Sequence, residues 1–138
     1  MITAVDSNIL IDILRADTDF GSASATALRH CRRDGRILVG EIVWAEVVGA
    51  VGETGRLTKL LDGLGLEYVP TTRPAADHAG RLWRRYRNAG GQRTRMVPDF
   101  LVGAHAVASA DRLLTRDRGF YRAYFRGLKI VDPSRPPR

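Results

Sequence analysis

The stretch ITAVDSNILIDIL, residues 2–14, changes character at Asp6. The apolar residues before Asp6 predict a short buried strand that ends at this acid. Residues 8–14, NILIDIL, have the apolar spacing of a helix, and either Ser7 or Asn8 is a suitable N-cap. The sequence therefore predicts a strand that passes directly into a helix, with an acid at the junction.

The rest of the chain repeats this alternation. Further strands are expected at 36–40, 66–70, 112–117 and 128–132, and further helices at 22–34, 41–53, 56–65, 74–89, 98–110 and 118–125, with a loop at 90–97. This order predicts an α/β fold: a three-layer α/β/α sandwich around a mainly parallel five-stranded sheet. Residues 1–132 are expected to form a single domain and residues 133–138 a loose C-terminal tail.

Composition limits the possible classes of protein. The chain has 138 residues, 44% of them hydrophobic, which is the size of one domain with enough apolar side chains for a core. No apolar run approaches the ~20 residues of a membrane span, and the N-terminus lacks the pattern of a signal peptide. The single cysteine, Cys31, excludes an internal disulfide framework and is typical of a reducing compartment. We therefore expect a cytoplasmic protein that does not bind membranes.

Glu46 is the most informative acid, because it is the only charged side chain between Ile42 and Gly52. Its neighbours three and four positions away on a helix are small or apolar, so we expect it to be buried. A buried carboxylate needs a cation, a metal ion or a strong donor nearby. An internal salt bridge with an arginine is the structural alternative.

Three further acids stand at the boundaries of apolar elements. Asp6 ends the first strand, Asp117 ends the fourth, and Asp99 follows Pro98 at the start of a helix. Each alone is explained by helix capping or by the helix dipole. Since ligand sites of parallel sheets lie off the carboxyl ends of the strands, however, we expect all of them to converge there with Glu46.

Four carboxylates in one place repel each other. Two like charges ~4 Å apart cost about 4 kcal/mol at an effective dielectric constant of ~20. Such a cluster must hold protons or bind a cation, and an all-oxygen ligand set favours Mg²⁺ or Mn²⁺. Ser7, Asn8 and Thr115 add neutral oxygens nearby, unless they serve only in turns and caps.

Four segments carry a family resemblance: VDSNILIDIL, WAEVVGA, VPDFLVGAHA and LLTRDRGFY. They occur in the order and rough spacing of the PIN-domain nucleases. Over residues 2–132 the chain resembles a VapC-type toxin of a bacterial type II toxin–antitoxin pair. The resemblance implies a parallel sheet between helices, commonly a homodimer, and the activity of an endoribonuclease that depends on Mg²⁺ or Mn²⁺ and blocks translation and growth.

The resemblance also implies roles by position. Asp6, Glu46 and Asp99 would bind most of the metal, and Asp117 would hold a second ion or orient the attacking water. Asn8 and Thr115 would support these acids from outside. Metal-activated water would leave 5′-phosphate and 3′-hydroxyl ends. A small VapB-type antitoxin would cover the acid site, on an apolar groove expected among the first two helices and residues 56–65.

The net charge of +7 favours a polyanionic partner such as RNA. Residues 81–95, RLWRRYRNAGGQRTR, place six arginines around Trp83 and Tyr86. These aromatic side chains either stack on bases or pack into the core. The candidate phosphate contacts are Arg84, Arg85, Arg93, Arg116 and Arg118.

Three other functions remain open. A phosphotransfer or phosphatase domain would explain acids at strand ends, but DSN lacks a second acid two residues after Asp6, and the only two lysines, Lys59 and Lys129, are poorly placed. A non-catalytic module that binds RNA or protein would make the acids structural. A nuclease for DNA would need segments that this short chain lacks.

Overall fold

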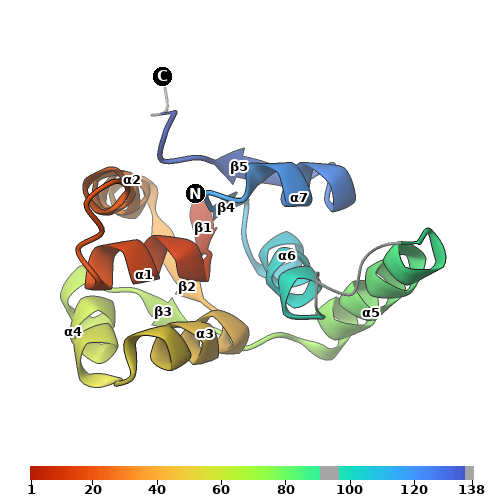
Figure 1. Ribbon diagram of the computed structural model, residues 1–138, viewed down its shortest axis with the longest axis horizontal. Coiled ribbons are helices and arrows are strands. Elements are labelled where there is room, and N and C mark those ends of the chain that lie inside the picture. The colour runs from red at the N-terminus through yellow and green to blue at the C-terminus, as the bar shows by residue number, and fades with distance from the viewer. Residues whose placement is uncertain (91–96, 136–138) are drawn as a thin grey trace.

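Five short parallel strands form the centre of the molecule, in the order β3-β2-β1-β4-β5 (Figure 1). The computed structural model describes residues 1–90 and 97–135. All four neighbouring pairs are parallel, which confirms the predicted α/β sheet. The strands are β1 (Ile2–Val5), β2 (Arg36–Val39), β3 (Glu67–Tyr68), β4 (Arg112–Leu114) and β5 (Lys129–Val131).

Seven helices connect these strands within the described ranges. They are α1 (Ser7–Leu14), α2 (Gly21–Asp34), α3 (Glu41–Val51), α4 (Gly55–Leu64), α5 (Arg73–Asn88), α6 (Val97–Ser109) and α7 (Arg118–Tyr124). Figure 1 shows α1, α2 and α4 to the left of the sheet and α5, α6 and α7 to its right. Right-handed crossovers produce these two layers, because the chain moves outward from β1 in one direction and from β4 in the other.

The helices and strands are those predicted; the strands are shorter than predicted, and the ends of the helices differ by one or two residues. β3 has two residues instead of five, and β4 ends at Leu114, before Thr115. The predicted loop at 90–97 falls mostly on residues 91–96, which lie outside the described residues. Residues 136–138 of the predicted tail also lie outside them, and the domain boundary at 132 stays a prediction.

The sequence left Asp6, Ser7 and Asn8 open as caps of α1, and the structure uses Asp6. The N-cap is Asp6, whose side chain accepts a hydrogen bond from the backbone N–H of Ser7. Ser7 and Asn8, the other two candidates, are helical residues instead. Since β1 stops at Val5, the acid itself occupies the junction between strand and helix.

Aromatic rings join α5, α6 and α7. Phe100 of α6 contacts Tyr86 of α5 and both Phe120 and Tyr124 of α7, with ring centroids 5.1–5.6 Å apart. Edge-to-face contacts of this kind add to the energy of burying the rings. They fix the start of α6, where Asp99 lies, against α7.

No helix within residues 1–90 and 97–135 is long and apolar enough to cross a membrane.

The close contact between α6 and the ring of Phe125 makes Gly103 a test of this packing. A Cβ atom on Gly103 would overlap that ring, whereas a Cβ on Gly80, in α5, would meet nothing within 4 Å. We expect Gly103→Ala to lower the free energy of unfolding by about 1–3 kcal/mol through overpacking. Gly80→Ala should raise it by up to about 1 kcal/mol through helix propensity.

The measurement is the midpoint of urea unfolding for the two variants and the parent protein. Equal midpoints for the two variants would contradict the packing described for α6.

Candidate active site

Asp6 lies at the carboxyl end of β1, beside the end of β4, and only 6% of it is exposed. Its Oδ1 accepts a hydrogen bond of 2.8 Å from the Ser7 N–H. Its Oδ2 accepts bonds from the hydroxyls of Thr115, at 2.8 Å, and Tyr121, at 3.1 Å, and a longer one from Asn8 Nδ2 at 3.4 Å. Four donors from three segments therefore hold one carboxylate.

Burial raises the pKa of Asp6 above its ordinary value, and the negative charge of Asp117 raises it further. The hydrogen bonds from Thr115, Ser7 and Tyr121 act in the opposite direction. The structure thus provides donors for the ionised form of Asp6, which partly offset the loss of water.

Thr115 connects the two strand ends. Its buried hydroxyl donates to Asp6, and the same oxygen accepts bonds from the Asp117 N–H, at 3.0 Å, and from Asn8 Nδ2, at 3.3 Å. The side-chain oxygen of Asn8 in turn accepts the Arg116 N–H at 3.2 Å. Asn8 and Thr115 therefore contact the first acid and position the loop that carries the fourth.

The four predicted acids share one electrostatic environment. Asp6 and Asp99 both raise the pKa of Glu46, and Asp117 raises that of Asp6. The pKa of Tyr121 is raised mainly by burial and also by the charges of Asp6, Asp99 and Asp117. These acids come from the end of β1, from α3, from the start of α6 and from the loop after β4, so the fold brings together residues that are far apart in the sequence.

The prediction that Glu46 is buried is wrong. Its side chain is exposed, and only Val43 and Val47 of α3 are buried. The apolar pattern misled because the intervening Ala45 and Gly49 are small and tolerate exposure, so α3 packs along one side only.

Although Glu46 is exposed overall, its carboxyl group lies where the neighbouring acids act on it. Partial desolvation, followed by repulsion from Asp6 and Asp99, raises its pKa to about 7, against an opposing hydrogen bond with the Ser7 side chain. Glu46 thus borders the site on its solvent side, whereas Asp6 forms the buried floor of the site.

The donor set fits a hard divalent cation. The acids and the nearby Asn8 and Thr115 supply only oxygen ligands, and the mutual repulsion of the acids would be relieved by a positive ion. Within residues 1–90 and 97–135, the side chains of Asp, Glu, His and Cys do not form a group of three that could hold one metal ion. The fit therefore rests on ligand chemistry and charge.

The predicted arginines have different environments. Arg116 forms a two-pronged ion pair with the buried Asp12, at 2.7 and 3.0 Å, and its guanidinium lies 4.0 Å from the centre of the Phe20 ring. Arg118 lies 3.8 Å from Asp132. Arg84 and Arg85 are exposed on α5, and Arg93 falls outside the described residues.

Two components of the site were missed in the sequence. Tyr121 donates to Asp6 from α7, and no spacing pattern distinguishes it from its core neighbour Phe120. Asp12 anchors Arg116 and also accepts a bond of 2.9 Å from the Ser24 hydroxyl. Asp12 could have been found, because it is a lone charge within the apolar helix that follows Asp6.

The acid cluster lies at the carboxyl ends of two adjacent parallel strands, and the helices that follow these strands lie on opposite faces of the sheet (Figure 1). This position is the topological switch point, where one class of α/β domains has its site. Within that class, the model of the PIN domain matches residues 3–126, so the chain belongs to the PIN domain family. Proteins of this family that act as nucleases generally use divalent metal ions. Comparison with curated protein sequences finds no match.

Solved structures share the fold at low sequence identity. A chain of VapBC2 from Rickettsia felis, bound to a promoter DNA fragment, is 20% identical with a TM-score of 0.73, and the match covers 96% of this chain and 98% of that one. A chain of the DNA-bound VapBC from Salmonella typhimurium is 15% identical with a TM-score of 0.72, over the same shares of the two chains. VapC20 from Mycobacterium tuberculosis, described as a Sarcin-Ricin loop cleaving toxin, is 13% identical with a TM-score of 0.66, over 92% and 98%.

The raised pKa of Glu46 gives a pH-dependent stability. The folded protein holds this proton up to about pH 7, whereas the ordinary pKa of a glutamate is 4.5. The stabilising effect is therefore complete below about pH 4.5 and is lost as the pH rises through 7. We expect Tm to fall less between pH 5 and pH 8 in Glu46→Gln than in the parent protein.

Thermal unfolding of both proteins at the two pH values measures this difference. Glu53→Gln, a change of another exposed glutamate just beyond α3, is the control and should retain the parent's fall in Tm. An equal fall in Tm in Glu46→Gln and in the parent protein would show that the acid cluster does not raise the pKa of Glu46.

Proposed function

We propose that this protein is a VapC-type toxin, an endoribonuclease that uses Mg²⁺ or Mn²⁺ to hydrolyse RNA phosphodiesters and so blocks translation and growth. The observation that carries the proposal is the convergence of Asp6, Glu46, Asp99 and Asp117 on one site. Membership of the PIN domain family supports it. The shared fold with VapBC chains and with a Sarcin-Ricin loop cleaving toxin supports the toxin class.

The proposed roles follow from the surroundings of each acid. Asp6, Glu46 and Asp99 would hold the ion, and Asp117 would hold a second ion or orient the attacking water. A bound divalent ion would polarise the phosphodiester and lower the pKa of a water molecule. The chain's own contribution is to keep Asp6 oriented through the hydroxyls of Thr115 and Tyr121 and the amide of Asn8.

The alternatives fit the structure less well. A phosphotransfer site needs a cation near the acids, but Lys129 lies at the amino end of β5, whereas Asp6 lies at the carboxyl end of β1, and Lys59 is exposed on α4. In a binding module with purely structural acids, nothing would favour placing the carboxylates where they repel one another. Glu46 and the neighbouring acids do repel one another.

The first experiment is cleavage of structured RNA by the purified protein with Mg²⁺, with Mn²⁺ and with EDTA. Asp99→Asn removes one charge with little change in shape, and we expect it to reduce the cleavage rate at least 100-fold. Asp62→Asn, which changes an exposed acid of α4, is the matched control and should cleave at the parent's rate.

The ends of the products identify the chemistry. Metal-activated water leaves 5′-phosphates, whereas a contaminating nuclease that uses the RNA 2′-hydroxyl leaves 2′,3′-cyclic phosphates. Equal cleavage by Asp99→Asn and the parent, or cyclic ends in EDTA, would refute the proposed activity. RNA binding without cleavage by the parent would favour the non-catalytic module.

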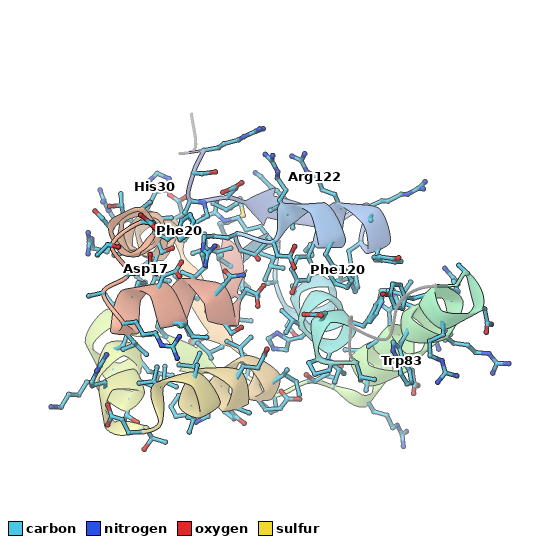
Figure 2. The ribbon with its side chains drawn as sticks, in the orientation of Figure 1. Asp17, Phe20, His30, Trp83, Phe120 and Arg122 are labelled. Carbon is cyan, nitrogen blue, oxygen red and sulfur yellow. The ribbon has the colours of Figure 1, made fainter. Side chains whose placement is uncertain are left out.

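We also propose a homodimer and a VapB-type antitoxin as partners. Partly buried apolar side chains occur on both α1 and α4, and Phe20, just before α2, is 42% exposed (Figure 2). These side chains lie on or beside the first two helices and residues 55–64, close to where the antitoxin groove is predicted. The α1 and α4 residues concerned are Ile11, Ile13, Leu14, Leu60, Leu61 and Leu64.

Expression in bacteria tests the partnership. The chain alone should arrest growth, Asp99→Asn should not, and co-expression of a small protein encoded beside it should restore growth. Leu60→Asp should prevent the rescue by placing a charge in the apolar surface, whereas Ala76→Asp, on the exposed side of α5, should not. A harmless parent chain, or rescue that is indifferent to Leu60→Asp, would contradict this part of the proposal.

A further inference from the structure

A groove separates α5 from the end of α7. One side is formed by Leu82, Arg85 and Tyr86 of α5, and the other by Ala123, Tyr124 and Arg126. Its volume of about 570 Å³ lies within the usual range of ligand clefts, about 300–1,000 Å³. A second hollow shares His78, Tyr124 and Arg126 with it and continues past Phe125 to Val107, Asp111 and Leu128.

The charge of this groove is positive. Arg85 and Arg126 are exposed on opposite sides of it, and no carboxylate from residues 1–90 and 97–135 lines the larger hollow. Neither arginine forms an ion pair with another described residue, in contrast to Arg116, which is held by Asp12. Two uncompensated guanidinium groups face one concave surface.

The aromatic ring of Tyr124 lines the groove together with the two arginines. Tyr124 is half-buried, with one edge packed against Tyr86 and Phe100 at 5.6 and 5.4 Å between ring centroids. A firmly packed ring in a basic groove is the arrangement that binds single-stranded nucleic acids, because phosphates contact the cations and bases stack on the ring.

The groove leads toward the acid site. Phe100, which packs against both tyrosines, directly follows Asp99 in α6, and α7 begins immediately after Asp117. One layer of aromatic rings therefore separates the groove from two of the four acids.

We propose that the α5–α7 groove binds a single strand of RNA beside the cleavage site, with Arg85 and Arg126 on its phosphates and Tyr124 stacked against a base. This inference rests on the proposed ribonuclease function, since it assigns a path to the substrate of the same site. A second copy of the chain is a poorer occupant, because a two-fold contact would place these arginines against each other. The apolar surface of α1 and α4 suits the protein partner better.

The chain offers matched controls on the same two helices. Arg84, a candidate phosphate contact in the sequence analysis, is exposed beside Arg85 but does not line the groove, so it is not part of the proposed path. Arg122 of α7 points away from α5 in Figure 2 and does not line it either. Glutamine in place of any of these four arginines removes the same charge, so a difference between the pairs measures position and not net charge.

The experiment measures binding of a fluorescent single-stranded RNA by anisotropy, in the Asp99→Asn background to prevent cleavage, from 50 to 300 mM KCl. Arg85→Gln and Arg126→Gln should each weaken binding roughly 3- to 10-fold and lower the slope of log K against log salt by about 0.7, the value for one phosphate contact on a single strand. Arg84→Gln and Arg122→Gln should do neither.

A cleavage assay in the chain with an intact Asp99 completes the test. The groove variants should raise KM for a long RNA and leave kcat unchanged, because they hold substrate away from the reacting bond. Equal losses in all four variants would overturn the proposal in favour of general charge attraction, and unchanged binding in Arg85→Gln and Arg126→Gln would overturn it outright. A change in oligomeric state confined to the groove variants would show a contact between copies instead.

These outcomes separate the two proposals. Position-dependent RNA binding in a protein that never cleaves would retain the groove and refute the nuclease. Metal-dependent cleavage that is insensitive to Arg85 and Arg126 would retain the nuclease and refute the groove.

Discussion

The parallel pairing of β1 with β4 is the constraint on which the site depends. Val5 lies opposite Leu114 in this pair, and the Asp6 N–H donates to the Leu114 carbonyl at 2.9 Å. The next residues on the two strands, Asp6 and Thr115, therefore emerge side by side, and their side chains form a bond of 2.8 Å. A register shift of one residue would turn each side chain to the other face of the sheet and separate this pair.

Around this pair, the fold gathers charges that oppose its stability. Desolvation and the charges of Asp6 and Asp99 raise the pKa of Glu46, and the charge of Asp117 adds to the desolvation that raises the pKa of Asp6. Fixed donors at Asp6, the Asp12–Arg116 ion pair behind the loop and the aromatic rings behind Asp99 hold the cluster in place. Cation binding would explain this arrangement. Binding a cation requires the acids to be ionised, whereas their mutual repulsion makes the ionised forms unfavourable for stability.

The positive charge of the molecule is also divided by position. Arg116 and Arg112 are used inside the structure, where they pair with Asp12 and Asp34 at 2.7 and 3.0 Å. Arg85 and Arg126 remain exposed along a groove. The net charge of +7 therefore overstates the number of arginines available to a polyanion, and it does not show where on the surface they lie.

The sequence by itself determined the order of strands and helices, the parallel sheet and the acids at its carboxyl edge, because short-range periodicity and chain connectivity encode them. It could not show that Glu46 is exposed, since an apolar helix looks the same whether one side or all sides are packed. Nor could it decide whether Asp6, Ser7 or Asn8 caps α1, or show that Tyr121 donates to Asp6 and that Asp12 pairs with Arg116. The last two contacts join residues more than a hundred positions apart, and only the packing of α7 and its loop against α1 and the ends of β1 and β4 decides which side chains meet there.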